Sequence, residues 1–577
     1  MSRRAALFLA ALAMLLAGCT GVPSSSAPQT VEPIQVGDGG GGQAQPPRGA
    51  GPRTMVALFL EANAAASVNH ASARAYLTRQ ARNRWSDQTA TIVTDQTLGT
   101  YDAKKGTLTV TGRVEGTLSA AGTYTPLIGS GGAKVPFVYR VTKVSGEYRI
   151  DPQRNGLLIT DAQFKESYQE HVLYFYDLSE RYLVPDVRWN SLPPTERQPI
   201  ATLLASELVN GPRPELQNVV TTSTLPAQAD ARGVTVKLGS PTEVEIPGSS
   251  QLDPDVRDRL AAQIAQTLDG PLSGGTVSIT DGGTPVTIPS TGGTIFSAST
   301  FAGATGPPTP PSNVYYLLGG RVIDEGGKPL SGPLGDGSYF LNSIAMARPP
   351  GIGSLAVAAV QGSGANARLY VGTQAGGLRA TTVRGTLSRP AWAPGRAEIW
   401  IGAGSAVKLV TTNGRTSLVR TVAISPTVGG GRIVALRLSP DGSRIALVVS
   451  GASPGSAQLY VGSVVRGAGQ VYVSALTPIS PASVVITDVG WNSPLKLFAI
   501  GYLAGSQDAR IFSMGVDGSA WTSSGIGTLP APPDSLTVTT YGLWVSSDGN
   551  VWTQSGNAWV SPGASGQTPG VNPVYLG

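Results

Sequence analysis

The stretch Arg368-Leu369-Tyr370-Val371-Gly372 recurs further along the chain as Gln458-Leu459-Tyr460-Val461-Gly462. Both have the composition of a β-strand that carries one aromatic residue. Related stretches occur at 408–410 and 510–513, and each copy follows another strand-like stretch, at 355–360, 397–402, 444–449 and 496–501. Equivalent positions are roughly 40–55 residues apart, which is the period of a β-propeller blade.

These repeats predict that residues 313–577 form an all-β propeller of five or six blades. Each blade has a hydrophobic face that only its neighbour buries, so the ring must close. Residues 314–318 are predicted to complete a blade whose other strands, 542–545 and 550–553, lie near the C-terminus. Turn-forming stretches are expected between blades, at 348–351, 392–395, 439–442 and 491–494. We expect most tryptophans of this segment to pack blade against blade.

Residues 170–290 have a different pattern, in which short strands alternate with two amphipathic helices. The first helix is predicted to bury Ile200, Leu203, Leu204 and Leu208 and to end at Asn210-Gly211. The second is predicted to begin at Asp253-Pro254, with Asp253 as N-cap, and to end at Gly270-Pro271. Strands are predicted at 171–177, 182–185, 233–238, 243–246, 276–279 and 284–288.

Three stretches of this middle segment resemble the successive motifs of the GerMN domain. They are Leu173-Tyr174-Phe175-Tyr176, Leu208-Val209-Asn210-Gly211-Pro212 and Ala265-Gln266-Thr267-Leu268. The resemblance implies an α+β fold that occurs in exported bacterial proteins and has no established enzymatic activity. His171 begins a strand without a companion ligand, so we expect it to be structural.

Residues 52–165 have helical spacing first and strand-like alternation afterwards. Met55, Leu58, Phe59 and Ala62 predict one helix, a short second helix follows around residues 73–77, and Trp85 is a predicted core anchor. Strands are predicted at 107–116, 135–144 and 146–150. This order resembles an NTF2-like α+β domain. His70 lies between the two helices and is expected to serve a loop or a helix cap.

The N-terminus has the features of an export signal. Arg3 and Arg4 precede an apolar run, 5–17, that is too short to span a membrane, and Leu16-Ala17-Gly18-Cys19 follows. This motif resembles the lipobox of bacterial lipoproteins and implies a signal peptide, 1–18, with S-diacylglycerol and an N-acyl group such as palmitate on Cys19. Sec export is favoured over the twin-arginine route.

Two segments of low complexity are predicted to connect the folded parts. A Ser/Pro/Gly-rich tether, 19–51, precedes the first folded segment, and a Pro-rich linker, 291–312, lies between the middle segment and the propeller.

No catalytic, cofactor-binding or metal-binding residue is predicted. The net charge of +6 is spread over 577 residues without a basic block, which disfavours a nucleic-acid partner. Gly451-Ala452-Ser453-Pro454-Gly455 fits a nucleophile motif, but no histidine follows it in the chain. Two histidines and one cysteine cannot supply a zinc site. Paired carboxylates remain available for glycosidase-type acid–base chemistry, so an enzyme of this kind is one possible function.

A lipobox, an NTF2-like segment, a GerMN-like segment and a propeller, in this order, resemble the actinobacterial LpqB lipoprotein family. The resemblance implies a multidomain, non-enzymatic lipoprotein anchored at the outer face of the cell membrane. Its implied partner is the extracytoplasmic domain of the sensor histidine kinase MtrB, in signalling for envelope homeostasis and division. The sequence indicates no partner-binding face. The alternative function is binding of cell-wall glycan.

If the lipobox is used, Cys19→Ala removes the only attachment point for the diacylglycerol. Two acyl chains anchor a protein stably, whereas one binds only marginally. We expect the variant to leave the membrane fraction and to lose function while its folded segments stay intact, as measured by detergent partitioning and circular dichroism. Full complementation by the untethered variant would contradict the importance of the anchor.

Overall fold

The computed structural model describes residues 45–65, 70–127, 133–222, 224–226, 230–306, 313–451, 456–467, 469–540, 542–563 and 567–576. The lipobox, Cys19, residues 307–312 of the Pro-rich linker and residues 452–455 of the nucleophile-like motif lie outside this range. Residues Gln45–Gly577 belong to one compact unit. No helix among the described residues is both long and apolar enough to cross a membrane.

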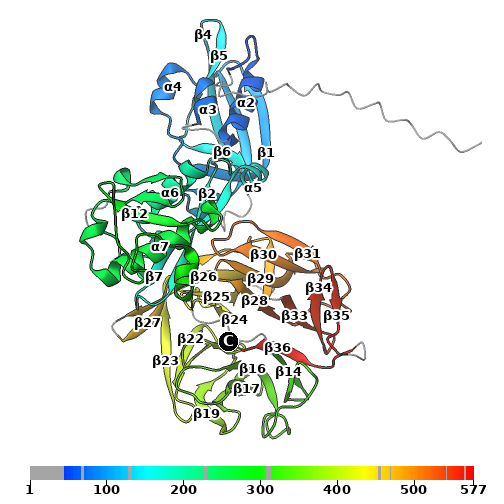
Figure 1. The fold of residues 1–577 in the computed structure, drawn as a ribbon. Helices are drawn as coiled ribbons and strands as arrows, with labels where there is room; N and C mark the ends of the chain where they lie inside the picture. Colours follow the sequence, from blue (N-terminus) through cyan, green and yellow to red (C-terminus); the bar gives the residue numbers. More distant parts are fainter. Residues whose placement is uncertain are drawn as a thin grey trace, which may run out of the picture. The chain divides into compact units, whose positions relative to one another are not determined.

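The N-terminal segment packs three helices, α2 (Pro52–Ala64), α3 (Ala71–Ala75) and α4 (Arg79–Arg84), against a six-stranded sheet (Figure 1). The strands are β1 (Ala90–Asp102), β2 (Thr107–Leu118), β3 (Tyr124–Pro126), β4 (Lys134–Val144), β5 (Glu147–Pro152) and β6 (Leu157–Thr160), followed by α5 (Asp161–Ser167). Their order is β5-β4-β2-β1-β6, with β3 beside β2. The predicted first helix is confirmed, and Phe59 of α2 lies 5.8 Å from the ring of Trp85, which is 4% exposed. Trp85 therefore anchors the core of this segment, as predicted.

Strand β1 is the longest of the elements of this segment that the sequence did not indicate; the others are α4, β3, β6 and α5. Its second half is half-buried or exposed, and Asp95 has a φ of +52°. The register with β2 shifts at three places, so the strand is irregular along its length. These bulges break the two-residue alternation on which strand prediction depends.

The middle segment has two small sheets, β8-β7-β9 and β10-β11-β12-β13, around two long helices (Figure 1). Its elements are β7 (Gln169–Asp177), β8 (Leu183–Asn190), α6 (Arg197–Asn210), β9 (Val220–Thr221), β10 (Thr235–Lys237), β11 (Thr242–Glu245), α7 (Pro254–Leu272), β12 (Val277–Asp281) and β13 (Thr284–Pro285), with the short 3-10 helices η2 (Pro214–Leu216), η3 (Ala231–Gly233) and η4 (Ser249–Gln251). The apolar faces of α6 and α7 share one core with Leu173 and Phe175 of β7. The order of strands and helices therefore follows the predicted one.

Four details of the middle segment differ from the prediction. Leu203 is only half-buried, because the buried face of α6 turns through Ala201 and Ala205 instead. Asp253 is at the N-cap of α7, but its side chain accepts no cap hydrogen bond. The helix continues through Pro271 to Leu272 and ends at Ser273, which has a left-handed φ of +52°.

The fourth difference concerns the predicted linker 291–312. Its described part, 291–306, packs against the middle segment instead of acting as a spacer. Phe296 is 2% exposed in the core of that segment, and its backbone pairs with Val277. A 3-10 helix, η5 (Ala298–Ala304), follows, and Phe301 contacts Phe296 with ring centroids 5.9 Å apart.

The C-terminal segment is a propeller in which the described strands form six groups, within the predicted range, and the third and fourth groups join into one eight-stranded sheet (Figure 1). The first group is β15-β14-β36, with β14 (Val314–Leu318), β15 (Arg321–Asp324) and β36 (Val571–Tyr575). The second is β16 (Leu341–Ala347), β17 (Ala356–Gln361), β18 (Arg368–Thr373) and β19 (Gly377–Arg384). The third is β20 (Ala391–Trp392), β21 (Glu398–Ala403), β22 (Ala406–Thr412) and β23 (Ser417–Ile424). The fourth is β24 (Arg432–Leu438), β25 (Arg444–Ser450), β26 (Ala457–Gly467) and β27 (Gln470–Pro478). The fifth is β28 (Val484–Ser493), β29 (Lys496–Leu503), β30 (Ala509–Gly515) and β31 (Thr522–Gly525). The sixth is β32 (Ser535–Thr539), β33 (Gly542–Ser547), β34 (Asn550–Ser555) and β35 (Ala558–Val560).

The sequence repeats correspond to the second and third strands of successive blades. The predicted turns, however, lie within blades, between the first and second strand, and not between blades. Trp392 and Trp491 lie beside two of these turns, and their indole N–H groups donate to the carbonyls of Ala345 (3.1 Å) and Arg437 (3.2 Å) on the first strand of the preceding blade. These tryptophans therefore hold neighbouring blades together, as expected.

The ring closes through a strand that the sequence did not indicate. Strand β14 pairs with β36, the last strand of the chain, whereas 542–545 and 550–553 belong to β33 and β34 of the preceding blade. The prediction of those two stretches as the closing strands is therefore wrong. Strand β36 contains Pro573 and has an irregular register, which weakens its strand signal.

Neighbouring blades meet in a largely buried ionic hub formed by Arg389 in the loop before β20, Arg437 of β24 and Asp488 of β28. Arg389 Nη2 lies 2.7 Å from Asp488 Oδ2, and Arg437 Nη2 lies 3.1 Å from Asp488 Oδ1. Arg389 also donates to the carbonyl of Pro573 in β36 (3.0 Å), and the backbone N–H of Leu536 in β32 donates to Asp488 (2.9 Å). Burial, together with the neighbouring Arg437, lowers the pKa of Arg389 to about 10, so it stays charged at neutral pH.

The variant Asp488→Asn leaves the guanidinium groups of Arg389 (9% exposed) and Arg437 (16% exposed) without their shared counter-charge. Breaking a buried ion pair typically costs about 3–5 kcal/mol, so we expect a loss of this size in the free energy of unfolding, measured by urea denaturation. Lys237→Ala is the control, because its pair with Glu243 is exposed and contributes less than about 1 kcal/mol. Equal effects of the two variants would show that the hub does not stabilise the ring.

Candidate functional site

The two histidines lie in different surroundings. His70 is at the N-cap position of α3, and its Nδ1 lies 3.1 Å from Asp87 Oδ2, while Arg74 pairs with the other oxygen of Asp87 at 2.8 Å. The helix-cap location is confirmed, although the side chain makes no cap bond. His171 is in β7, and no group of three or more metal-binding side chains occurs among the described residues.

Strand β8 contains buried charged side chains that alternate with apolar ones. Asp186 is fully buried and Arg188 is 4% exposed. Arg188 donates to Asp186 (2.8 Å) and to the carbonyl of Ala121 in the N-terminal segment (3.1 Å). Asp186 also accepts from the backbone N–H of Arg213 (2.9 Å). Strand β8 therefore fixes the loop before β3 to the segment that follows α6.

The next residue of β8 contacts the propeller. The indole N–H of Trp189 donates to Asp517 Oδ2 (3.0 Å), and its ring lies 4.9 Å from that of Phe164 in α5. Arg444 of β25 is 4% exposed and donates to the carbonyl of Pro185 (2.6 Å). Strand β8 thus bonds to the N-terminal segment and to two blades of the propeller.

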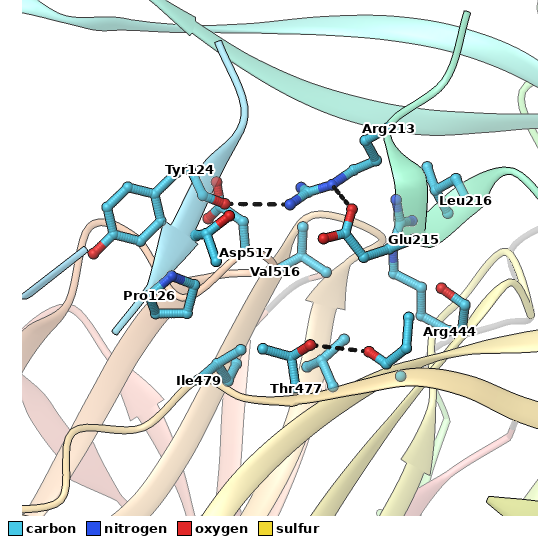
Figure 2. A pocket seen from close by; sticks show the side chains of 15 residues that line it. Tyr124, Pro126, Arg213, Glu215, Leu216, Arg444, Thr477, Ile479, Val516 and Asp517 are labelled. Atoms are coloured by element: carbon cyan, nitrogen blue, oxygen red, sulfur yellow. Dashed lines mark hydrogen bonds and ion pairs between the residues drawn. The ribbon is translucent and has the colours of Figure 1, made fainter. Parts of the chain in front are cut away.

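A small cavity lies at this junction (Figure 2). Figure 2 shows Arg213 between Tyr124 and Glu215: its guanidinium donates to the carbonyl of Tyr124 (3.2 Å) and pairs with Glu215 (2.9 Å). Burial alone would raise the pKa of Glu215, but the charge and hydrogen bond of Arg213, a backbone hydrogen bond and the charge of Arg188 together hold that pKa below its ordinary value. The cavity has a volume of about 50 Å³, enough for a few waters but far below the size of a typical ligand pocket.

Two larger grooves have the volume of a ligand site. The first, about 720 Å³, lies between β2, α5 and two loops of the propeller. Its carboxylates have nearby partners, since Glu115 accepts from Thr94 (2.8 Å) and Asp161 pairs with Lys165 (2.8 Å). The second, about 540 Å³, lies entirely within the middle segment, between β7, α6 and the end of α7.

The junction residues could have been recognised in the sequence, because Pro185-Asp186-Val187-Arg188-Trp189 places two charges in an otherwise strand-like apolar stretch. Charged side chains are rarely fully buried unless they are paired. Their partners come from distant positions, such as Asp517, which no local pattern indicates. The arrangement acts as a rigid joint between segments, and it offers no nucleophile or metal ligand set.

Comparison with known proteins gives two family matches. Residues 45–165 match the model described as "Lipoprotein LpqB, N-terminal domain", and residues 320–575 match the "Lipoprotein LpqB beta-propeller domain". Lipoprotein LpqB of Rhodococcus jostii is 29% identical over 455 residues, which cover 74% of each chain. Lipoprotein LpqB of Mycobacterium paratuberculosis is 32% identical over 277 residues, so the match spans 46%, about half, of each chain.

Among solved structures, a putative TolB from Agrobacterium tumefaciens matches 37% of this chain and 76% of its own. The sequence identity is 17% and the TM-score is 0.27, so this likeness carries no functional argument.

Replacing Trp189 by Phe keeps a ring beside Phe164 but removes the donor to Asp517. A hydrogen bond to a charged group contributes about 1.5–3 kcal/mol, so we expect a loss of this size in unfolding free energy and faster amide exchange along β8. Trp521→Phe is the matched control, because its indole donates to the neutral carbonyl of Ile479 (3.0 Å) and is worth about 0.5–1.5 kcal/mol. A larger effect of the control would contradict the role of the Trp189 bond.

Proposed function

The chain belongs to the LpqB lipoprotein family, and from this membership we propose that it is a lipid-anchored accessory protein of a two-component sensor kinase of the MtrB type. It is held at the outer face of the cell membrane through Cys19 and modulates the kinase through the kinase's extracytoplasmic domain. Its process is envelope homeostasis and division. Family membership is the observation that carries the proposal.

The buried charges support a binding function without catalysis. The carboxylates that line the small junction cavity are held by structural bonds, Glu215 to Arg213 and Asp517 to Trp189. The relatives that match this chain are named as lipoproteins, and their names indicate no enzymatic activity. A protein that only binds gains from confinement, because a short tether raises the effective concentration of its surfaces beside a membrane partner to about the millimolar range.

The proposal is tested by crosslinking intact membranes, extracting them with detergent and recovering the complexes on the full lipidated chain. We expect a sensor kinase to be enriched relative to a control lipoprotein of similar size, and Cys19→Ala to abolish the enrichment. Recovery of cell-wall glycan alone, together with sedimentation of the protein with purified wall material, would overturn the proposal in favour of the glycan-binding alternative.

A further inference from the structure

The edge of β7 that faces away from β8 is only partly covered (Figure 1 shows β7 and α7). In an antiparallel pair, the N–H and C=O of one residue point to the same edge, and those of the next residue point to the other. Tyr176 points away from β8 and pairs with Thr221 of β9. Tyr174 points the same way, and α7 supplies both of its partners: its N–H donates to Thr267 Oγ1 (3.2 Å), and its carbonyl accepts from Gln263 Nε2 (2.9 Å).

The same alternation directs the backbone groups of Val172 and Glu170 to this edge. Neither β9 nor α7 bonds to them, and within the described ranges no other strand pairs with them. Two N–H and two C=O groups thus lie on an unpaired strand edge. Native proteins usually cover such an edge or use it to bind another strand.

The 540 Å³ groove runs along this unpaired edge. One wall is β7 itself, from Gln169 to Val172, and the other wall is formed by α6 and the end of α7. Its lining combines apolar and polar side chains: Val172, Ile200, Leu204, His171, Gln266 and Asp269. A strand beside β7 would point alternate side chains into the groove, since successive side chains of a strand face opposite sides.

His171 provides a further unused group. Its Nε2 atom is buried and has no hydrogen-bond partner among the described residues. Burial lowers the pKa of His171, so the ring is neutral at pH 7, and a neutral ring can donate or accept at Nε2. The Nε2 atom can therefore form a hydrogen bond with a strand that lies in the groove.

The charge at the groove favours a basic partner. Asp269 is exposed at its rim, and the last turn of α7 has no basic residue to offset the partial negative charge of the helix end. Arg197 is the one basic residue of the lining, and its Nε is held by the carbonyl of Pro271 (2.9 Å).

We propose that the open edge of β7 binds an extended segment of a partner protein, which pairs with Glu170 and Val172 as an added strand and places a basic side chain near Asp269. The inference rests on the proposed function for the identity of that partner, the extracytoplasmic domain of the kinase. Pairing of this kind takes its affinity from main-chain hydrogen bonds and its specificity from alternate side chains.

The decisive variant is Val172→Pro in the full chain. Proline removes the N–H that the partner strand needs, while a strand tolerates it where the N–H faces away from the sheet. Val172→Thr is the matched control, because it keeps the N–H and the branched shape. We expect the Kd for the purified extracytoplasmic domain to rise at least about tenfold with proline and less than about threefold with threonine.

A second variant blocks the groove without touching β7. Gly270 lines the groove, and a Cβ there would have no atom within 4 Å, so Gly270→Trp fits the fold and fills the space beside the strand. Gly303→Trp is its control, at another glycine with equally open surroundings that does not line the groove. We expect only Gly270→Trp to weaken binding, again at least about tenfold.

Each outcome separates the inference from the function on which it rests. Loss of binding in Val172→Pro and Gly270→Trp, with unchanged melting temperatures, supports both. Wild-type affinity in both variants overturns the strand-pairing inference and leaves the proposed function standing. Absence of binding by the wild-type chain overturns the proposed function and the partner assignment together. Loss of glycan binding in the two variants, without any kinase binding, would identify the groove as a saccharide site and overturn the inference.

Discussion

One carboxylate bonds to two guanidinium groups that come from neighbouring blades of the propeller, and the ring depends on this arrangement. Asp488 is 6% exposed, and its two oxygens bond to Arg389, Arg437 and a backbone N–H of β32. These groups belong to different blades, so the contact forms only when the blades are in register. Hydrophobic burial between blades is not directional, whereas the geometry of these bonds selects one arrangement of the ring.

The junction along β8 applies the same principle between segments. A strand of eight residues contributes apolar side chains to the cores on both sides, and its two charges and one indole bond to groups from three parts of the chain. Each of these polar groups is buried, so separating the segments would expose them or leave them without partners. The described segments are therefore held together as one compact unit, and relative motion between them has a high energetic cost.

The sequence was informative where local pattern and tertiary structure agree. The repeated strands of the propeller, the faces of α2 and α7 and the glycine that ends α6 all follow from local periodicity and turn chemistry. Strand β1 was missed because its bulges destroy that periodicity, and β36 because proline weakens its signal. The turns were placed between blades because a repeat fixes a period but does not show where one blade ends. The hub and the partners of the junction residues could not be predicted, since Asp488 and Asp517 are recognised only through contacts with residues that are distant in sequence.

The pairing of β14 with β36 also determines when the propeller ring can close during synthesis. The first propeller strand begins at Val314, and its neighbour in the sheet ends at Tyr575. The ring therefore cannot close during synthesis until its last strand has emerged, while the helices and sheets of the preceding segments consist of residues made earlier. Unpaired blade edges are exposed during that interval, and exposed edges are where misfolding and aggregation begin. The newly made chain thus passes through a vulnerable stage that ends when β36 pairs with β14.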